Sequence, residues 1–339
     1  MALGSASKSV GLEIDTGIAR VTEAVGSAGK PKLTNMTMGK LPLGSVEEGM
    51  IVQPREVGTA LGEMWSSGQV KNRQVLLGIS NQGVLVRYAT VPRVDPDKLD
   101  NVIKFQAQEH LPIPLDSVVM DYQVIGETTT SEGNALLEIL LVAARRDMLD
   151  GFMEALDIAG LEPVDIDVSI LSLMRTLPAA AMKRTVAVIN VANGLSNILV
   201  SDRGSPRLAR LVSVKLKDLA ERFGCSLEDV ISYSAGGSAR EGEIYSGWAS
   251  ELITEISSSL NYYQNQAGSS SLEAIIINGR GGRLKGIATR LEEALDLPVR
   301  IVNPFNGFSN ADQISEGSGL KAVEYAICAG LARRGLEGS

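Results

Sequence analysis

The sequence is poor in the residues from which several common sites are built. Its 339 residues include two cysteines, Cys225 and Cys328, and one histidine, His110. The cysteines stand in neither a CxxC pair nor a Cys/His cluster, so a disulfide framework and a zinc site both lack ligands. His110 has no serine or cysteine beside it in a recognisable elbow, which argues against a hydrolase triad. These absences favour a protein of a reducing compartment.

A basic surplus and a long hydrophobic run are also missing. Lys and Arg number 32 against 40 Asp and Glu, and the net charge of −8 disfavours a general attraction to nucleic acid or anionic membranes. The longest apolar candidate, residues 135–144, contains Glu138 and falls short of the ~20 residues that a membrane-spanning helix needs. The amino terminus, MALGSASKS, holds no hydrophobic signal core. We therefore expect a cytoplasmic protein that reaches a membrane only through a partner.

What the sequence does contain is a β-hairpin pattern that occurs twice. Residues 185–200 read TVAVINVANGLSNILV, an apolar strand, a tight turn at Asn193 and Gly194, and a returning strand. Residues 10–25 read VGLEIDTGIARVTEAV, with the same order of elements. With 44% hydrophobic residues, the chain can fill more than one core. Two similar hairpins, one opening each half, predict a duplicated α/β architecture with a cleft between the halves.

The segments after each hairpin complete two lobes and a smaller module. The first half adds a strand at 32–39, a helix at 54–70 and a strand at 73–80. An order of strand, helix, strand, strand, helix, strand then suits an inserted ferredoxin-like module, with elements at 84–91, 97–110, 118–125, 136–144, 147–159 and 164–168. In the second half we expect helices at 170–182, 217–223, 227–233, 246–266, 284–295 and 319–334, strands at 205–214, 272–278 and 299–302, and a flexible loop at 234–243.

A glycine-rich turn, NGRGG at residues 278–282, follows one of these strands and precedes a helix. Small residues at such a turn let backbone N–H groups approach a phosphate, and a helix start favours anions. Together with the two hairpins and the small-residue helix near the end, this turn resembles the actin-like ATPase superfamily, in which two phosphate loops, an adenosine loop and a closing helix follow in this order. The inserted module resembles that of the cell-division protein FtsA.

Three longer segments are similar to the PilM family, the cytoplasmic actin-like proteins of type IV pilus assembly. They read KFQAQEHLPIPLDSVVMDYQVIG at 104–126, VDIDVSILSLMRTL at 164–177 and LPVRIVNPF at 297–305. The resemblance covers roughly residues 8–334 and implies an α/β, two-lobed actin-like (ribonuclease H-like) fold with a ferredoxin-like inserted subdomain. It implies a first lobe made of 8–83, 169–184 and the C-terminal helix 319–334, an inserted subdomain at 84–168, and a second lobe at 185–318.

The resemblance also implies a partner. PilM proteins bind the amino-terminal cytoplasmic peptide of the inner-membrane protein PilN in a groove beside the inserted module, which places them at the inner membrane through that partner. Pilus motor ATPases are further candidate partners, and nucleic acid is not expected. We hypothesise that the groove is lined by parts of 84–91 and 97–111, with Leu99, Val102 and Ile103 as anchors. The alternative is that these apolar side chains fill the core.

An ATP site with Mg²⁺ between the lobes is the other implication of the resemblance. The candidate nucleotide-binding residues come from three turns: Glu13, Asp15, Thr16, Gly17 and Arg20 from the first, Asn190, Asn193, Gly194 and Ser196 from the second, and Gly279, Arg280 and Gly281 from the third. No metal ligand and no catalytic residue is assigned.

The first turn departs from the pattern of the superfamily, which is Asp-x-Gly-Ser/Thr with a basic residue seven positions after the Asp. Glu13 and Arg20 keep the two charges, but Asp15 replaces the glycine. A carboxylate facing phosphate opposes binding unless Mg²⁺ or Arg20 offsets it. A register that starts at Asp15 restores Asp-x-Gly but puts Thr22 where the base belongs.

The other two turns depart as well. Asn190 stands where an Asp is expected and cannot act as a base or carry negative charge to Mg²⁺, and Ala192 replaces a glycine. Arg280 interrupts the glycine pair of the adenosine loop, where its side chain could stack on adenine or fill the pocket. These departures favour a binding scaffold, with or without bound ATP, over an efficient ATPase. The alternative is an active actin-like ATPase whose nucleotide cycle or polymerisation drives pilus assembly.

Overall fold

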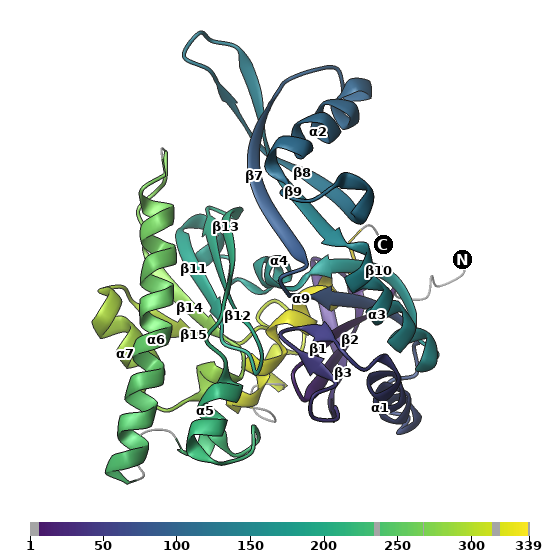
Figure 1. The fold of residues 1–339 in the computed structure, drawn as a ribbon, viewed down its shortest axis with the longest axis vertical. Coiled ribbons are helices and arrows are strands. Elements are labelled where there is room, and N and C mark those ends of the chain that lie inside the picture. Colours follow the sequence, from purple (N-terminus) through teal and green to yellow (C-terminus); the bar gives the residue numbers. More distant parts are fainter. Residues whose placement is uncertain (1–6, 234–237, 267, 314–318, 338–339) are drawn as a thin grey trace. The chain divides into compact units, whose positions relative to one another are not determined.

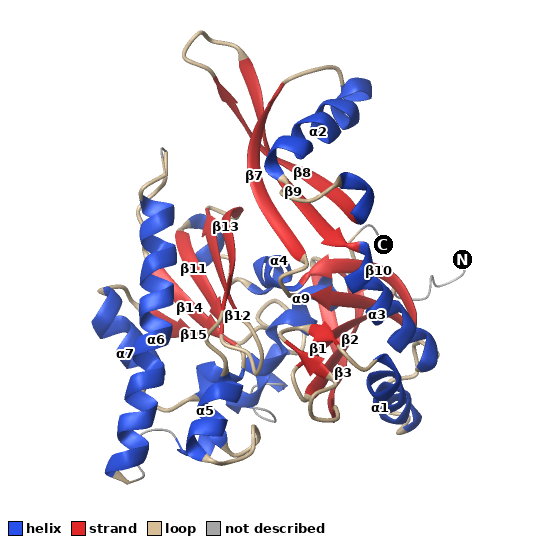
Figure 2. Ribbon diagram, viewed as in Figure 1, coloured by secondary structure: helices blue, strands red, loops and turns tan. Residues whose placement is uncertain are grey.

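The structure is a computed structural model that describes residues 7–233, 238–266, 268–313 and 319–337. It divides into two compact units, one of Met1–Asn81 with Met153–Ser339 and the other of Gln82–Phe152 (Figure 1). Each unit contains both helices and strands (Figure 2). Within the described ranges, none of the helices combines the length and the apolar character that crossing a membrane requires.

The first sheet of the larger unit is built around the amino-terminal hairpin. β1 (Lys8–Asp15) and β2 (Ile18–Ser27) are antiparallel, and Gly17 in the turn between them has a φ of 74°, which a residue without Cβ adopts most readily. The strand order is β10-β6-β1-β2-β3, and the three added strands are β3 (Lys30–Lys40), β6 (Gln74–Ile79) and β10 (Glu162–Val168). The short ladder of β4 (Val46–Glu47) and β5 (Met50–Ile51) precedes helix α1 (Pro54–Ser66).

The second sheet repeats this plan. β11 (Thr185–Asn190) and β12 (Ser196–Asp202) form the second hairpin, with Val188 opposite Leu199. The strand order is β13-β12-β11-β14-β15, and the remaining strands are β13 (Ser205–Val212), β14 (Ala274–Asn278) and β15 (Val299–Ile301). In both sheets the first hairpin strand pairs antiparallel with its partner and parallel with a later strand, β1 with β6 and β11 with β14. The duplicated pattern predicted from the two hairpins is confirmed.

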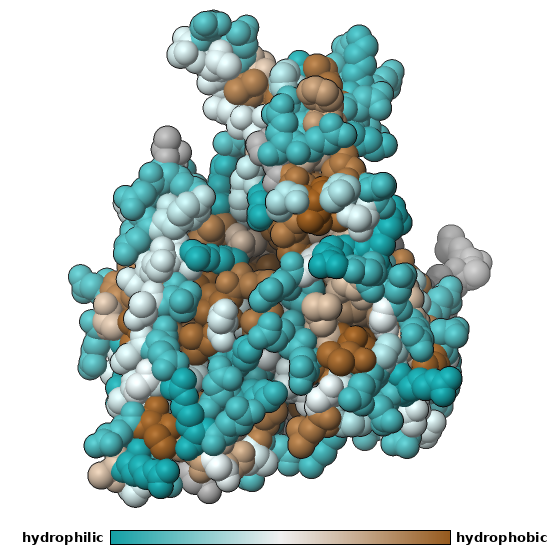
Figure 3. Space-filling view, in the orientation of Figure 1, coloured by the Kyte–Doolittle hydropathy of each residue, from teal (hydrophilic) through white to brown (hydrophobic). Residues whose placement is uncertain are grey.

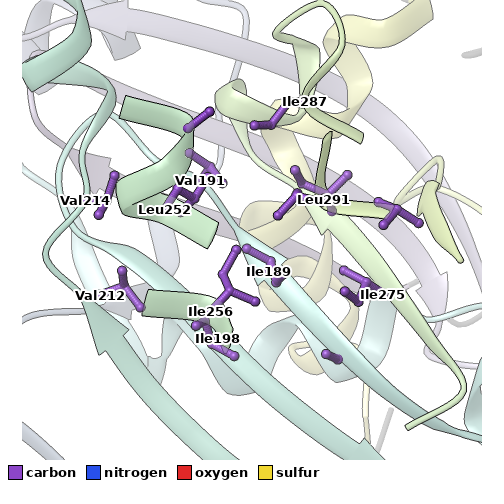
Figure 4. Packing of buried hydrophobic residues seen from close by; sticks show 14 of the residues in the cluster. Ile189, Val191, Ile198, Val212, Val214, Leu252, Ile256, Ile275, Ile287 and Leu291 are labelled. Atoms are coloured by element: carbon purple, nitrogen blue, oxygen red, sulfur yellow. The ribbon is translucent and has the colours of Figure 1, made fainter. Parts of the chain in front are cut away.

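Three helices supply apolar side chains to the core of the second sheet: α5 (Leu216–Phe223), α6 (Ala239–Gln264) and α7 (Ile287–Leu295). Figure 4 shows this core, in which Ile189 and Ile275 from the sheet meet Leu252 and Ile256 from α6. Trp248 of α6 is completely buried, and its indole N–H donates to the carbonyl of Lys215 at 2.9 Å. A core of this size fixes the strand ends that carry the second and third turns.

Helix α6 begins seven residues before the start at 246 that the apolar stripe predicts. Ser238 caps it by accepting from the Glu241 N–H, while the Glu241 carboxylate accepts from the Ser238 N–H at 2.5 Å, which is a complete capping box. The first two turns of the helix are polar, and the apolar period therefore misses them. Residues 239–243 of the predicted flexible loop are helical, and residues 234–237 lie outside the described part of the chain.

Other predicted helices are shorter or differently wound. The helix predicted at 170–182 is three short turns, α4 (Ser169–Ser172), η2 (Leu173–Thr176) and η3 (Ala181–Lys183), because the proline at 178 holds Leu177 in an extended conformation. The helix predicted at 284–295 starts at Ile287 after the 3₁₀ turn η5 (Arg280–Arg283). The helix predicted at 319–334 starts with the 3₁₀ segment η6 (Gly319–Tyr325) and continues as α9 (Ala326–Arg334). The segment predicted as a helix at 227–233 holds the 3₁₀ turn η4 (Val230–Tyr233).

The smaller unit holds a three-stranded sheet in the order β7-β9-β8. Its elements are β7 (Val84–Pro92), α2 (Pro96–His110), η1 (Leu115–Ser117), β8 (Val118–Thr129), β9 (Ala135–Arg145) and the start of α3 (Arg146–Ile158). Residues of α2 share one core with all three strands, and that core includes Val91, Ile103, Val118 and Ile139. The six elements expected of a ferredoxin-like module are present in order, but the sixth, β10, pairs with β6 of the larger unit. Sequence order alone does not reveal which sheet edge a strand joins.

Candidate functional site

The turns of the two hairpins meet through the side chain of Asp15. One carboxylate oxygen, Oδ2, accepts from the Asn193 N–H at 3.0 Å, and the other, Oδ1, accepts from the Gly194 N–H at 3.0 Å and from the Thr16 N–H at 2.7 Å. The side-chain amide of Asn193 also donates a hydrogen bond to the Thr16 carbonyl at 3.0 Å. Residues separated by 178 positions in the chain are thus joined around one buried carboxylate.

The first turn approaches the second turn most closely at Gly194. A Cβ on Gly194 would lie 2.7 Å from the Thr16 hydroxyl and 3.1 Å from Asp15 Oδ1. Position 194 therefore favours glycine because side chains of the first turn approach its Cα directly, although its own backbone conformation is ordinary.

The third turn packs against the second. The Gly281 N–H donates to the Val191 carbonyl at 2.9 Å, and the Gly279 N–H donates to the Val323 carbonyl of η6 at 3.2 Å. A Cβ on Gly279 would lie 2.6 Å from the Asn190 side-chain oxygen. The three predicted turns therefore form one cluster, together with η6.

Six buried or half-buried charged side chains fill the cluster, three carboxylates and three guanidinium groups: Glu13, Asp15, Glu324, Arg20, Arg280 and Arg283. Arg20 lies 3.6 Å from Glu13, 3.7 Å from Asp15 and 3.6 Å from Glu324. Glu324 also lies 3.4 Å from Arg280 and is paired with Arg283. Arg280 in addition donates to the Leu227 carbonyl at 3.1 Å.

Burial shifts the acid–base equilibria of the cluster. It raises the pKa of Glu13 from its ordinary value of 4.5 to about 7, with the Asp15 carboxylate adding to the rise and the Arg20 guanidinium opposing it. Burial also raises the pKa of the Cys328 thiol, which lies 3.2 Å from the Arg20 carbonyl and 3.7 Å from Glu13. A thiol that holds its proton this firmly is a poor nucleophile, and Cys328 acts here as a packing residue.

The raised pKa of Glu13 makes the stability of the protein depend on pH with a defined sign. The folded protein holds this proton to higher pH than the unfolded chain, so the stabilisation is fully present below pH 4.5 and is lost as the pH rises through about 7. Glu13→Gln carries no such proton. We expect the free energy of unfolding of the original protein to fall relative to that of Glu13→Gln by roughly 3 kcal/mol over this interval.

Urea titrations of both proteins at several pH values measure this difference. The other titrating groups are common to the two proteins and cancel in the comparison. Curves that stay parallel between pH 4.5 and about 7 would contradict the raised pKa of Glu13.

The structure brings together the three turns that carry the residues predicted for the nucleotide site. The Ser196 hydroxyl instead donates to the Val214 carbonyl at 2.6 Å on the β13 side of the sheet. Three residues of the cluster were not predicted from the sequence: Arg283, Glu324 and Cys328. The available signal was a lone glutamate in the otherwise uncharged segment AVEYAICAGLA. Among the described residues, no group of three or more His, Cys, Asp or Glu is arranged to hold a metal ion.

The three residues predicted to anchor a peptide differ in exposure. Ile103 is 1% exposed and belongs to the core of the smaller unit. Leu99 and Val102 are half-buried at the edge of that core. Phe105, one turn further along α2, is 66% exposed. Ile103 thus fills the core, as the alternative reading of this segment held, Leu99 and Val102 pack against the edge of that core, and Phe105 is the exposed apolar side chain of this segment.

A family model described as type IV pilus assembly protein PilM matches residues 11–336. The chain belongs to the PilM family. Its structure is similar to a chain of the solved PilM-PilN type IV pilus biogenesis complex, with 25% identity, a TM-score of 0.83, and coverage of 97% of this chain and 98% of that one. The resemblance found in the sequence is confirmed over nearly the whole length.

More distant structures share the fold alone. The ethanolamine utilization protein EutJ from Carboxydothermus hydrogenoformans has a TM-score of 0.54 at 12% identity, covering 96% of this chain and 89% of that chain. MreB5 of Spiroplasma citri, solved with bound AMPPNP, has a TM-score of 0.53 at 10% identity, covering 94% and 98%. The predicted actin-like fold is therefore confirmed for this PilM family member.

The nucleotide that the fold implies does not fit the residues present at the three turns. The Asn193 and Gly194 N–H groups, which a phosphate would need, already donate to the Asp15 carboxylate. The guanidinium groups of the cluster are already paired with carboxylates. A bound phosphate would meet the Asp15 charge directly, which opposes binding.

Proposed function

We propose that this PilM family protein is a scaffold of the type IV pilus assembly platform that binds the amino-terminal cytoplasmic peptide of a PilN-like inner-membrane protein. The observation that carries the proposal is its likeness to the PilM-PilN complex, at a TM-score of 0.83 over 97% of the chain. On this proposal the chain works in the cytoplasm, and the membrane segment of the partner holds it at the inner membrane. Binding a peptide requires shape and a few buried anchors but no catalytic residue.

The smaller unit offers one accessible apolar stripe for such a peptide. Leu99, Val102 and Phe105 follow one another at intervals of three along α2, so successive members are neighbours in a row that turns about 120° around the helix from Leu99 to Phe105. Ile103 is turned from Val102 by about 100° around the helix and faces the core of its own unit. In Figure 3 the surface over α2 is mainly hydrophilic, with small hydrophobic areas. We assign the peptide site to this stripe.

The test is the affinity of the purified protein for a fluorescently labelled peptide with the amino-terminal sequence of the PilN-like partner. Phe105→Ala is expected to raise the Kd at least tenfold, because an exposed aromatic anchor at the centre of a small interface carries much of the binding energy. Tyr262→Ala is the matched control, since Tyr262 is also an aromatic residue on a helix and is 58% exposed, but on α6 of the larger unit. Both variants should keep the melting temperature of the original protein.

Two results separate the parts of this proposal. A Kd that is unchanged in Phe105→Ala and in Val102→Ala would move the peptide site away from α2 while leaving the partner in place. A peptide that fails to bind the original protein, with the full cytoplasmic segment of the partner failing too, would overturn the proposed function.

A further inference from the structure

We propose that Asp15 supplies, from the chain itself, the anion that a nucleotide phosphate supplies in an actin-like cleft, and that the two hairpin turns are held together without nucleotide. The carboxylate bridges two successive backbone amides, Oδ2 to Asn193 and Oδ1 to Gly194, both at 3.0 Å. Two adjacent N–H groups that converge on one point form an anion-binding turn. Hydrogen bonds to an ionised acceptor are about twice as strong as those between neutral groups.

The position of Asp15 in the sequence explains why it reaches this turn. It ends β1 and opens the first hairpin turn, where its Oδ1 also accepts from the next N–H, that of Thr16. That local bond holds the carboxylate over the turn and directs it at residues 193 and 194. Asp15 is 7% exposed, so water does not compete strongly for its oxygens.

The charges around Asp15 are arranged for a carboxylate and not for a phosphate. Arg20 lies 3.7 Å from Asp15 and also pairs with Glu13 and Glu324. Arg280 and Arg283 pair with Glu324 on the other side. A nucleotide triphosphate would bring several more negative charges into a cluster in which each guanidinium already has a carboxylate partner.

The space is taken as well. Gly194 and Gly279 approach the neighbouring turns so closely that even a Cβ would overlap with them. The Arg280 side chain extends from Glu324 to the Leu227 carbonyl and is 7% exposed, so it fills the third turn and does not line an open pocket. Asp15 and Arg280 together therefore close the cleft from within.

The experiment is a thermal melt of the full chain with and without Mg²⁺-ATP, and separately with pyrophosphate, for the original protein, Asp15→Gly and Asp15→Asn. The original protein should show no shift with either ligand. Both variants should melt several degrees lower, and Asp15→Gly, which frees the two amides and removes the negative charge, should be shifted upward by Mg²⁺-ATP or pyrophosphate. Asp121→Asn is the control, because Asp121 makes the same bond to the next N–H at 2.8 Å but is exposed and belongs to the smaller unit.

Each outcome decides the proposal. An upward shift of the original protein with Mg²⁺-ATP overturns it, because the two amides would then be available to phosphate, and this arm does not depend on any variant folding. If the Asp15 variants melt at the same temperature as Asp121→Asn, Asp15 does not join the turns, and the proposal is overturned. An Asp15→Gly protein that is destabilised but indifferent to pyrophosphate refutes the claim that the carboxylate stands where phosphate would bind, because pyrophosphate does not need the third turn that Arg280 fills. None of these melts depends on the PilN-like peptide, so failure of the proposed function leaves them unchanged.

Discussion

Glu324→Gln is expected to lower the free energy of unfolding by about 3–5 kcal/mol, because it leaves buried positive charge without compensation. Glu324 is 3% exposed and pairs with Arg20, Arg280 and Arg283. Glutamine has nearly the same shape, so the packing is conserved and only the charge is lost. Arg20, 2% exposed, then has Glu13 and Asp15 alone, and Arg280 has no carboxylate among the six residues of the cluster.

Glu337→Gln is the matched control for this prediction. Glu337 lies thirteen positions further along the chain and pairs with Arg175 at 2.8 Å, but its side chain is 50% exposed. Exposed pairs of this kind contribute about 0–1 kcal/mol. Urea denaturation of the two variants at pH 7 gives the comparison, and equal losses in both would show that the cluster behaves as a solvated surface network.

The charge cluster also explains how separate elements reach one arrangement. β2 brings Arg20, η5 brings Arg280 and Arg283, and η6 brings Glu324. A buried ion pair is weak evidence for net stability, because desolvation offsets most of the attraction. Removing one partner is nevertheless strongly destabilising, so the cluster penalises any packing of these three elements that separates the charges. The charge cluster therefore determines how β2, η5 and η6 pack together more than it adds to the free energy of unfolding.

The sheets could be predicted from sequence because their signals are local. A hairpin needs two apolar strands and a turn, and both hairpins are written within about sixteen residues each. The pairing of β11 with β12 is centred on Asn193 and Gly194, where the sequence predicted the turn, but the innermost pair is Asn190 with Asn197, so the connection is six residues long and not a tight turn. The order of elements around them then indicated the family, and with it the fold.

The parts that could not be predicted depend on contacts between distant segments. The pairing of β10 with β6, the bonds from Asp15 to the second turn and the partners of Glu324 all join residues that no short pattern connects. Asp15 was correctly placed in the first turn, but it appeared as an obstacle to phosphate, and its role as an acceptor for Asn193 and Gly194 required the structure. The polar start of α6 was not predicted although its capping box is a local signal, because the prediction relied on the apolar period and these residues do not carry it.

Gly330→Ala is expected to lower the free energy of unfolding by about 3 kcal/mol or more, at the upper end of the range for an overpacked core. Gly330 lies inside α9, where alanine is intrinsically favoured over glycine by about 1 kcal/mol. Its Cα faces the backbone of Ser172, and a Cβ would lie 2.7 Å from the carbonyl carbon of that residue. The obstacle is main chain and cannot change rotamer, so α9 must move away from η2 and α4.

Gly247→Ala in α6 is the same substitution, but it is expected to raise the free energy of unfolding and not to lower it. Gly247 is also inside a helix, but nothing lies within 4 Å of the Cβ that it would gain. The helix preference then acts alone and should stabilise the protein by about 0.5–1 kcal/mol. Denaturant titrations of the two variants therefore separate backbone preference from packing. If both variants gain stability, α9 does not pack against Ser172 as closely as the structure shows, and the small residues of this helix would reflect composition and not contact.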